Sequence, residues 1–277
     1  NDAVFEGLWV KDYPTLIRLE KKADMYKHGK IEWFKVGGED AYAIAPSGPV
    51  DEQRRWVWFS PGRLATKRWS NPISPDQNVE NQYYVEAALA KGFHVAGIMT
   101  EPLAASPAGV ALHQKFYETV TRKYRLHKKP RLMAQSNGGL MHYAWAWRYP
   151  ECVDRIGGTF PVTDFRTWPG LDKLVGPGCI IPEGFRYGLS PEEFASRITE
   201  FNPVEHTAPL AKAGVKVLHI HGDQDAPVPV GPNSEEFAKR YRQDGGEIEI
   251  QVIEGAGHEG IAAFYESEKM RDFLLGE

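Results

Sequence analysis

One stretch of the sequence constrains the fold more than any other. Residues 131–140 read Arg-Leu-Met-Ala-Gln-Ser-Asn-Gly-Gly-Leu: an apolar strand end, small residues around one serine, then a helix start. Ala134 and Gly138, two positions before and after Ser136, are small enough to face each other across a sharp strand-to-helix turn. The pattern Ala-x-Ser-x-Gly differs by one methyl group from Gly-x-Ser-x-Gly. We expect Ser136 to stand exposed at the top of a sheet, where it needs a base and an acid to react.

Two later segments present those partners at the ends of predicted strands. The β-branched run over residues 215–221 leads into Gly-Asp-Gln-Asp, which ends at Asp225. The alternating run over residues 249–253 leads through small residues to His258. The order Ser136, Asp225, His258 is the chain order of the α/β-hydrolase triad and differs from the order in chymotrypsin or subtilisin.

Strands and helices alternate along the rest of the chain. We expect strands over residues 31–36, 41–45, 55–60, 93–99, 132–135, 155–161, 215–221 and 248–253, and helices over residues 78–91, 108–125, 137–149, 234–242 and 261–275. Such alternation predicts an α/β fold with a mostly parallel central sheet and helices on both faces. Ligands bind beyond the carboxyl ends of the strands in these sheets, where all three triad candidates lie.

From about Lys30 to the C-terminus, this layout resembles the α/β-hydrolase superfamily. The resemblance implies an α/β-hydrolase fold in which Ser136 is the nucleophile, His258 the general base and Asp225 the acid that orients the imidazole. The sequence shows neither repeats nor a low-complexity linker, so we expect residues 1–277 to form a single domain. Residues 163–212 are too long for a simple connection and are predicted to form a lid-like insertion.

The acid of the triad has two rivals. Asp223 lies two residues before Asp225 and would otherwise stabilise the loop by capping backbone amides. Asp164 follows the strand that ends at Val162, and some superfamily members carry the acid at that place. The resemblance matches Gly-x-x-Asp-x-x-Val-Pro, which implies Asp225 as the acid.

Negative charge that develops on a substrate oxygen needs fixed donors. The amide of Asn137, directly after the serine, would be one donor at the positive end of the following helix. The resemblance implies a second donor in the loop after the strand over residues 55–60, where Ser-Pro-Gly-Arg replaces a His-Gly-x segment. We expect the amide of Arg63 to be that donor, with Gly62 as the alternative.

Several side chains are candidates for holding the substrate. Arg63, with Arg68 and Arg166, would grip a carboxylate or phosphate, although three solvated surface arginines explain the sequence as well. Trp69 and Trp168 would stack against a sugar or aryl ring, and packing in the core is the alternative for each.

Composition excludes some partners. A net charge of −4 without a basic stripe gives no reason to expect nucleic acid. No apolar run approaches the roughly 20 residues of a membrane span, so we expect no membrane partner. His219 and His221 alternate like metal ligands, but His-Gly-Asp-x-Asp is common in the superfamily without a metal. We therefore expect no metal and no cofactor, and leave the oligomeric state open.

The cysteines and the first residue give indications of where the protein is located in or outside the cell. Cys152 and Cys179 form no metal-binding motif and are expected to be two buried free thiols, with pairing as the alternative. The chain begins with Asn1 rather than Met, which fits removal of a signal peptide as well as a trimmed chain. We expect an exported protein, secreted or periplasmic.

Further segments refine the resemblance. Residues 56–58, 135–139, 202–204 and 208–210 look like those of bacterial prolyl-oligopeptidase-like and carbohydrate-esterase-like members. The resemblance implies a serine hydrolase that cleaves a carboxylic ester through an acyl-enzyme. Its expected substrate is a small-molecule or glycan ester, such as an acetylated sugar or a uronate methyl ester. The alternatives are a serine peptidase of the prolyl-oligopeptidase type and a non-catalytic binding protein on a hydrolase scaffold.

Overall fold

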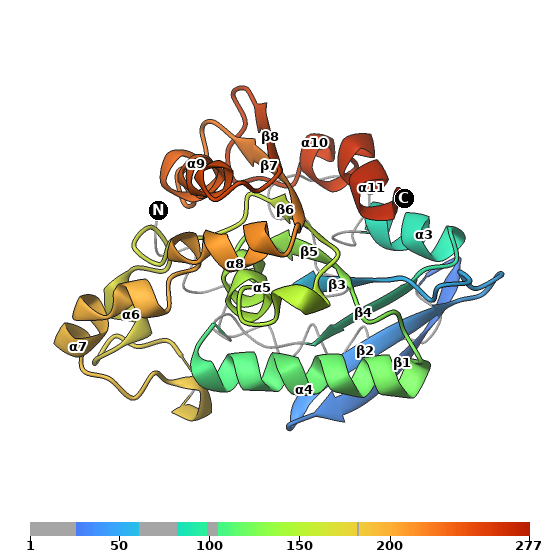
Figure 1. Cartoon of the computed structure of the whole chain (residues 1–277), viewed down its shortest axis with the longest axis horizontal. Helices are drawn as coiled ribbons and strands as arrows, with labels where there is room; N and C mark the ends of the chain where they lie inside the picture. The colour runs from blue at the N-terminus through green and yellow to red at the C-terminus, as the bar shows by residue number, and fades with distance from the viewer. Residues whose placement is uncertain (1–25, 61–81, 99–104, 182) are drawn as a thin grey trace.

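The computed structural model describes residues 26–60, 82–98, 105–181 and 183–277. Its centre is an eight-stranded sheet with the strand order β1-β2-β4-β3-β5-β6-β7-β8 (Figure 1). The strands are β1 (Gly29–Val36), β2 (Glu39–Pro46), β3 (Trp56–Ser60), β4 (His94–Ile98), β5 (Arg131–Gln135), β6 (Arg155–Thr159), β7 (Lys216–Gly222) and β8 (Ile248–Ile253). β1 and β2 form an antiparallel hairpin, β2 pairs antiparallel with β4, and the remaining pairs are parallel.

Helices pack on both faces of this sheet. The α-helices are α3 (Gln82–Ala90), α4 (Pro107–Tyr124), α5 (Gly138–Ala146), α6 (Leu171–Leu174), α7 (Pro191–Ser196), α8 (Thr207–Lys212), α9 (Glu236–Gln243), α10 (Ala262–Tyr265) and α11 (Glu268–Leu275). One core cluster joins α4, α5, α8 and α9 to the sheet, and a second joins α3, α10 and α11 to its opposite face. The predicted α/β fold, with a mostly parallel sheet between two helical layers, is confirmed.

Short helical segments complete the connections. The 3-10 turns are Pro150–Cys152, Glu183–Phe185, Ile198–Glu200 and Pro203–Glu205, and Gly231–Glu235 is a π-helical segment. Most of these turns, with α6, α7 and α8, lie in the long connection between β6 and β7. Since that connection leaves and re-enters at parallel strands, it begins at the edge of the sheet where Ser136 lies.

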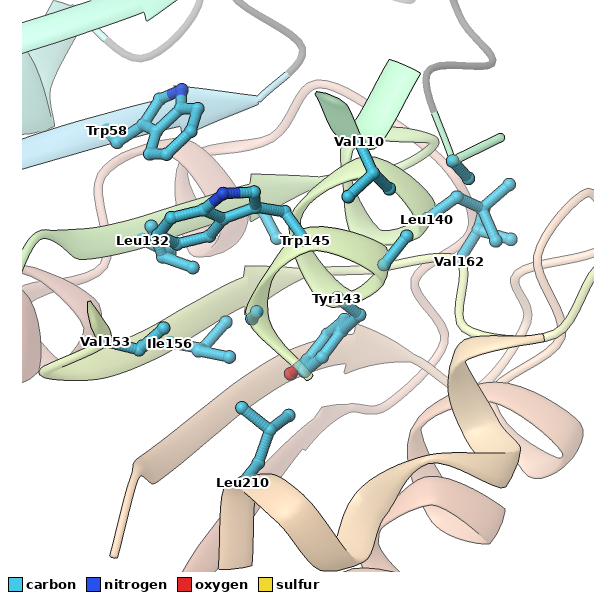
Figure 2. Packing of buried hydrophobic residues seen from close by; sticks show 14 of the residues in the cluster. Trp58, Val110, Leu132, Leu140, Tyr143, Trp145, Val153, Ile156, Val162 and Leu210 are labelled. Atoms are coloured by element: carbon cyan, nitrogen blue, oxygen red, sulfur yellow. The ribbon is translucent and has the colours of Figure 1, made fainter. Parts of the chain in front are cut away.

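Alternation along β3 shows how the strands serve both layers. All five of its residues are buried, with Trp56 and Trp58 in one cluster and Val57 and Phe59 in the other. The ring of Trp58 lies 4.9 Å from that of Trp145 on α5 (Figure 2). Burying such large rings contributes strongly to folding, since Phe and Trp bury 150–250 Å² each. Three of the eight tryptophans, Trp56, Trp58 and Trp145, are thus buried in the core.

Two sequence predictions need correction. The single closing helix expected over residues 261–275 is two helices, because the hydroxyl of Ser267 accepts a hydrogen bond from the amide of Met270 at 3.2 Å and starts α11 afresh. Cys152 and Cys179 are both free thiols, as expected, but both are only partly buried. None of the helices in the described ranges is long and apolar enough to cross a membrane.

Candidate active site

Ser136 lies at a tight turn between β5 and α5. Its φ is +50°, a left-handed conformation that strains a residue with a side chain. Its amide donates to the carbonyl of Thr159 at 3.0 Å, and its carbonyl accepts from the amide of Val162 at 2.8 Å. A Cβ at Gly139 would lie 2.4 Å from the carbonyl oxygen of Val162, so the start of α5 can approach this loop only with glycine there. These contacts hold the strained turn in place.

Two consecutive hydrogen bonds join the side chains of Ser136, His258 and Asp225. The Ser136 Oγ lies 3.0 Å from His258 Nε2, and His258 Nδ1 lies 2.7 Å from Asp225 Oδ2. Because a carboxylate only accepts, Nδ1 carries the hydrogen of a neutral ring and Nε2 is free to accept the hydroxyl proton of Ser136. The side chain of His258 is 5% exposed and that of Asp225 is fully buried. The arrangement can pass a proton from the hydroxyl to the imidazole.

The loop that carries His258 crosses back over the sheet. β8 is the outermost strand, so His258 must pass over β7 and β6 to reach the serine after β5. The amide of Gln224 donates to the carbonyl of Ala256 at 2.9 Å. Asp223 Oδ1 accepts from the amide of Gly255 at 2.7 Å. Asp223 therefore caps this loop, as its alternative role predicted, while Asp225 contacts the imidazole.

Burial and hydrogen bonds oppose each other at Asp225. Desolvation would raise the pKa of the carboxyl, but donors from His221, His258 and the amide of Val228 hold it below its ordinary value. The Val228 amide lies 2.8 Å from Asp225 Oδ1. Asp225 is thus ionised at neutral pH and can stabilise a positive charge on His258.

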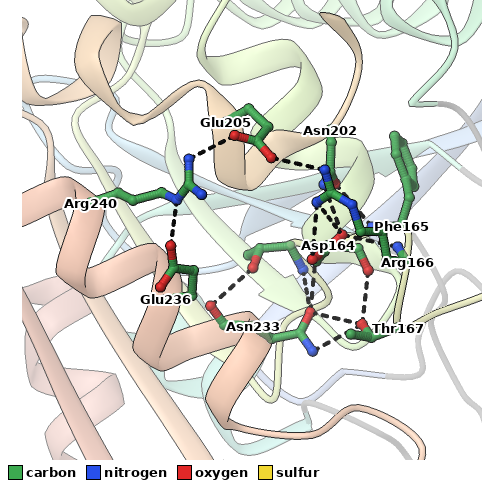
Figure 3. A network of polar contacts seen from close by, with 10 residues as sticks. Asp164, Phe165, Arg166, Thr167, Asn202, Glu205, Asn233, Glu236 and Arg240 are labelled. Carbon is green, nitrogen blue, oxygen red and sulfur yellow. Dashed lines mark hydrogen bonds and ion pairs between the residues drawn. The ribbon is translucent and has the colours of Figure 1, made fainter. Parts of the chain in front are cut away.

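Asp164 belongs to a different network (Figure 3). Its Oδ1 accepts from the amide of Arg166 at 2.9 Å and from Asn202 Nδ2 at 2.8 Å. The side-chain oxygen of Asn233, just before α9, accepts from the amide of Thr163 at 2.9 Å. These bonds tie the start of the connection between β6 and β7 to Asn202, later in the same connection, and to the π-helical segment before α9. Asp164 makes no contact with His258, so its position favours a structural role.

Only two of the predicted substrate-binding side chains, Arg166 and Trp168, belong to the described residues. Arg166 pairs with Asp164 at 3.2 Å and with Glu205 at 3.1 Å, so its charge is already matched by two carboxylates. Arg63, Arg68 and Trp69 lie outside the described residues. Trp168 is half-buried against the core and is not among the residues that line the pocket at Ser136. A substrate contact by Trp168 stays a prediction.

One of the two expected oxyanion donors can be placed. Asn137 is 2% exposed and directly precedes α5. Among the described residues, no group accepts a hydrogen bond from its backbone amide. A bond from that amide to a substrate oxygen beside Ser136 stays a prediction. The second expected donor, the amide of Arg63, and its alternative Gly62 lie outside the described residues.

A small pocket opens at the serine, and the sequence did not predict most of its lining. Its walls are formed by Gln135, Ser136, Phe160, His258, Glu259, Gly260 and Tyr265. The Phe160 ring packs 4.2 Å from the His258 ring, and Gln135 Nε2 donates to the Tyr265 hydroxyl at 2.5 Å. β6 ends at Thr159 rather than at residue 161, and Phe160 adopts a φ of +35°. Only its place after a parallel strand signalled that Phe160 would lie near the site.

The alternating histidines of β7 both face the hydroxyl of one buried serine. Within the described ranges, no group of three or more His, Cys, Asp or Glu side chains could hold a metal ion. His219 Nδ1 and His221 Nδ1 instead face the hydroxyl of Ser234 at 2.9 and 2.8 Å. These two rings belong to the polar interior of the protein.

Comparisons with solved structures show the fold. Pyrococcus horikoshii acylaminoacyl peptidase is similar with a TM-score of 0.63 and 15% identity, over 95% of this chain and 42% of that one. Porphyromonas gingivalis dipeptidyl peptidase 4 is similar with a TM-score of 0.61 and 14% identity, over 95% of this chain and 37% of that one. The chain thus spans about two fifths of the length of these peptidases. TT1662 from Thermus thermophilus is similar with a TM-score of 0.55 and 16% identity, over 90% of this chain and 99% of that one.

Sequence comparison adds the family. No curated protein sequence matches the chain. The sequence model of the prolyl oligopeptidase family matches residues 118–276, more than half of the 277 residues. The matched range contains β5 to β8 and the loops that carry Ser136, Asp225 and His258. The expected resemblance to α/β hydrolases is confirmed, and the chain belongs to the prolyl oligopeptidase family of serine hydrolases.

Proposed function

We propose that Ser136, His258 and Asp225 form a catalytic triad that hydrolyses acyl compounds through an acyl-enzyme. The observation that carries this proposal is the pair of hydrogen bonds, 3.0 and 2.7 Å long, that joins the three side chains in the order the chemistry needs. The strained backbone at Ser136 supports it, because strain of this kind is retained where it presents a nucleophile.

The reaction follows from the geometry. His258 Nε2 accepts the proton as the Ser136 Oγ attacks the substrate carbonyl, and Asp225 stabilises the imidazolium that forms. The amide of Asn137 donates to the oxyanion. His258 then passes the proton to the leaving group, which departs and leaves an acyl-serine. Water, activated by the same imidazole, releases the acid and restores the hydroxyl.

For the substrate, we propose the amide bond of a short peptide or N-acylated peptide. Membership of the prolyl oligopeptidase family and the two similar peptidases support this choice over the carboxylic ester of a carbohydrate. Glu259 in the pocket supports a peptide with a free amino group in particular, since among the described residues its carboxylate has no cationic partner and would attract an ammonium group. The same carboxylate would repel an anionic uronate.

We also propose that the chain acts as one domain with residues 163–212 as a lid. The bonds of Asn233 to the amides of Thr163 and Asp164 support this, because they hold the start of the insertion on the body of the fold. The bond from Asn202 to Asp164 ties a later part of the insertion back to that start. A lid in this place would exclude water from the acyl-enzyme and select the size of the substrate.

A fluorophosphonate probe and a substrate panel test the function. We expect the probe to label Ser136 in the wild type and nothing in Ser136→Ala. Short peptide anilides and N-acylated peptides should be cleaved faster than acetylated or methyl-esterified glycans. Undiminished hydrolysis by Ser136→Ala would refute the triad. Faster release of acetate or methanol from glycans than cleavage of peptides would show that the substrate is a carbohydrate ester.

A further inference from the structure

A chain of hydrogen bonds leads from Asp225 into the core. His221 Nε2 lies 2.7 Å from the carbonyl of Val228 and 3.4 Å from Asp225 Oδ2. His221 Nδ1 faces the hydroxyl of Ser234 at 2.8 Å, and that hydroxyl faces His219 Nδ1 at 2.9 Å. His219 Nε2 faces the hydroxyl of Tyr143 at 2.6 Å. The side chains of this chain, named here the acid-support chain, are Tyr143, His219, Ser234 and His221, and all four are fully buried.

The acceptors at one end set the direction of every bond. The Val228 carbonyl and the Asp225 carboxylate only accept, so His221 Nε2 must carry a hydrogen. In a neutral ring, His221 Nδ1 is then an acceptor and takes the hydroxyl hydrogen of Ser234. The oxygen of Ser234 accepts from His219 Nδ1, which leaves His219 Nε2 to accept from Tyr143. Burial lowers the pKa of His219 to about 3, which agrees with a neutral ring.

Every donor in the acid-support chain thus points toward Asp225. The alternative tautomer of His221 would turn an Nε2 lone pair toward a carbonyl and a carboxylate, which is repulsive. The hydroxyl of Ser234 disfavours that tautomer because it already donates to Nδ1. The role of the more distant groups is therefore to keep one hydrogen on one nitrogen beside the acid.

The contact of His221 also fixes the turn that carries the acid. Val228 donates its amide to Asp225 Oδ1 at 2.8 Å and accepts the hydrogen of His221 on its carbonyl. At 3.4 Å the contact from His221 to Asp225 Oδ2 is long, so the hydrogen points mainly at Val228 and adds a weaker attraction to the carboxylate. His221 consequently restrains both the position and the charge of Asp225.

The members come from separate elements. His219 and His221 lie on β7, Ser234 lies in the π-helical segment before α9, and Tyr143 lies on α5. The hydroxyl of Tyr143 points away from α5 (Figure 2). Because α5 begins two residues after Ser136, the acid-support chain connects the helix that follows the nucleophile with the loop of the acid. Asn233, the neighbour of Ser234, fastens the insertion (Figure 3).

We propose that His221 is a positioning residue for the acid of the triad, and that Ser234, His219 and Tyr143 hold it in the one tautomer that can do so. The proposal rests on the proposed function, in which Asp225 orients His258. Since the acid-support chain touches no substrate, it should affect turnover and leave substrate binding alone.

The first test compares two replacements of His221. His221→Phe keeps a ring but removes the donor, and we expect kcat to fall roughly 10- to 100-fold with KM within about twofold of wild type. His221→Gln can present an amide hydrogen near the former Nε2, and we expect it to recover most of the lost kcat. Wild-type kcat in His221→Phe, or a Gln variant no better than Phe, overturns the proposal.

Two distal variants give a second, independent reading. We expect Ser234→Ala to lower kcat by roughly 3- to 10-fold and Tyr143→Phe by less than about threefold, because each acts through more intervening bonds. The matched control is His142→Phe, since His142 is a fully buried histidine whose ring nitrogens bond to none of the described residues. It should change the melting temperature with kcat within about twofold of wild type.

The order in which the variants lose kcat distinguishes a positioning role of the acid-support chain from a role in packing. Losses in kcat that follow the melting temperatures rather than the distance from Asp225 overturn the proposal. If His221→Phe does not fold, Ser234→Ala decides, and wild-type kcat in that variant overturns the role of the tautomer. Ser136→Ala is assayed in parallel. If it is inactive while His221→Phe has wild-type kcat, the positioning role of His221 is wrong and the triad stands. If Ser136→Ala is active, the triad itself is wrong.

Discussion

Gly222, the last residue of β7, lies against the carbonyl of Ala256, and a Cβ on Gly222 would meet that oxygen at 2.1 Å. The contact joins the strand that leads to Asp225 with the loop that leads to His258. Gln224 adds a backbone bond to the same carbonyl at 2.9 Å. The spacing between acid and base is therefore set by backbone packing as well as by their own hydrogen bond.

Gly222→Ala should damage both stability and turnover. The added methyl group must push the loop away, and overpacking of this kind costs about 1–3 kcal/mol. Because His258 follows Ala256 by two residues, we expect kcat to fall further than the loss of folded protein explains. Thermal unfolding and steady-state kinetics check this. Gly48→Ala, at a site with open space around the glycine, is the matched control, and equal behaviour of the two variants would contradict the prediction.

Asp225→Asn and Asp164→Asn should separate chemistry from structure. Loss of the charge at Asp225 leaves the imidazolium of His258 without its partner, and we expect kcat to fall by about 10⁴-fold. Asp164→Asn weakens the bonds to Arg166 and Asn202, so unfolding should become easier by roughly 1–3 kcal/mol while kcat stays near wild type. Assays of both variants at matched folded concentration decide the matter, and a reversal of the two phenotypes would reassign the acid.

Glu259→Gln should change the choice of substrate. The carboxylate lines the pocket beside Ser136, so its removal takes away an attraction for a substrate ammonium group. We expect kcat/KM for peptides with a free amino terminus to fall about 10- to 100-fold. The values for their N-acetylated forms should stay the same or rise. A parallel loss for charged and neutral peptides would show that Glu259 acts on the fold or on His258 instead.

Buried histidines should make the protein sensitive to mild acid. Burial lowers the pKa of His94 and of His113 to about 4, and lowers the pKa of His142 as well. The unfolded chain takes up protons near pH 6.5 while these rings stay neutral in the fold. Stability should therefore fall as the pH drops from about 6.5 to 4, by up to about 1.4 kcal/mol per pH unit for each ring.

Denaturation at several pH values checks this sign. The free energy of unfolding should be highest at or above pH 7, and His113→Phe should flatten the slope below about pH 6.5. His113 packs edge-on to Trp58 at 5.7 Å, so a phenyl ring can take its place. A free energy that is constant between pH 7 and 5 would argue that these rings are protonated in the folded protein.

Local sequence patterns predicted the fold well because each strand and turn depends mainly on residues that are close together in the sequence. The alternation around Trp56–Ser60, the β-branched run of β7 and the small residues around Ser136 each depend on neighbours in the sequence. They placed Ser136, Asp225 and His258 at strand ends, and the structure brings these side chains into hydrogen-bond distance. Their roles in catalysis stay predictions until the variants above are measured.

Other features depend on contacts between distant segments. Phe160 and Glu259 line the pocket only because β6 and the loop after β8 meet there, and neither carries a local signal. The four groups that support Asp225 lie on three elements, so no spacing in the sequence reveals them. The break before α11 depends on the hydroxyl of one serine, which periodicity cannot distinguish from a helical position.

The strand order also separates the reacting groups from one whole side of the protein. β1 is the edge strand farthest from β8, and the β1–β2 turn ends at Gly38, an exposed residue with free space around it. Because β1 runs parallel to β5, this turn lies at the same edge of the sheet as Ser136, but β2, β4 and β3 stand between them. A fluorophore, an affinity handle or a surface anchor inserted after Gly38 would therefore stand to the side of the reacting groups. Such an insertion would allow the protein to be attached to a surface, or followed in single-molecule measurements, through a site separated from the groups proposed to react.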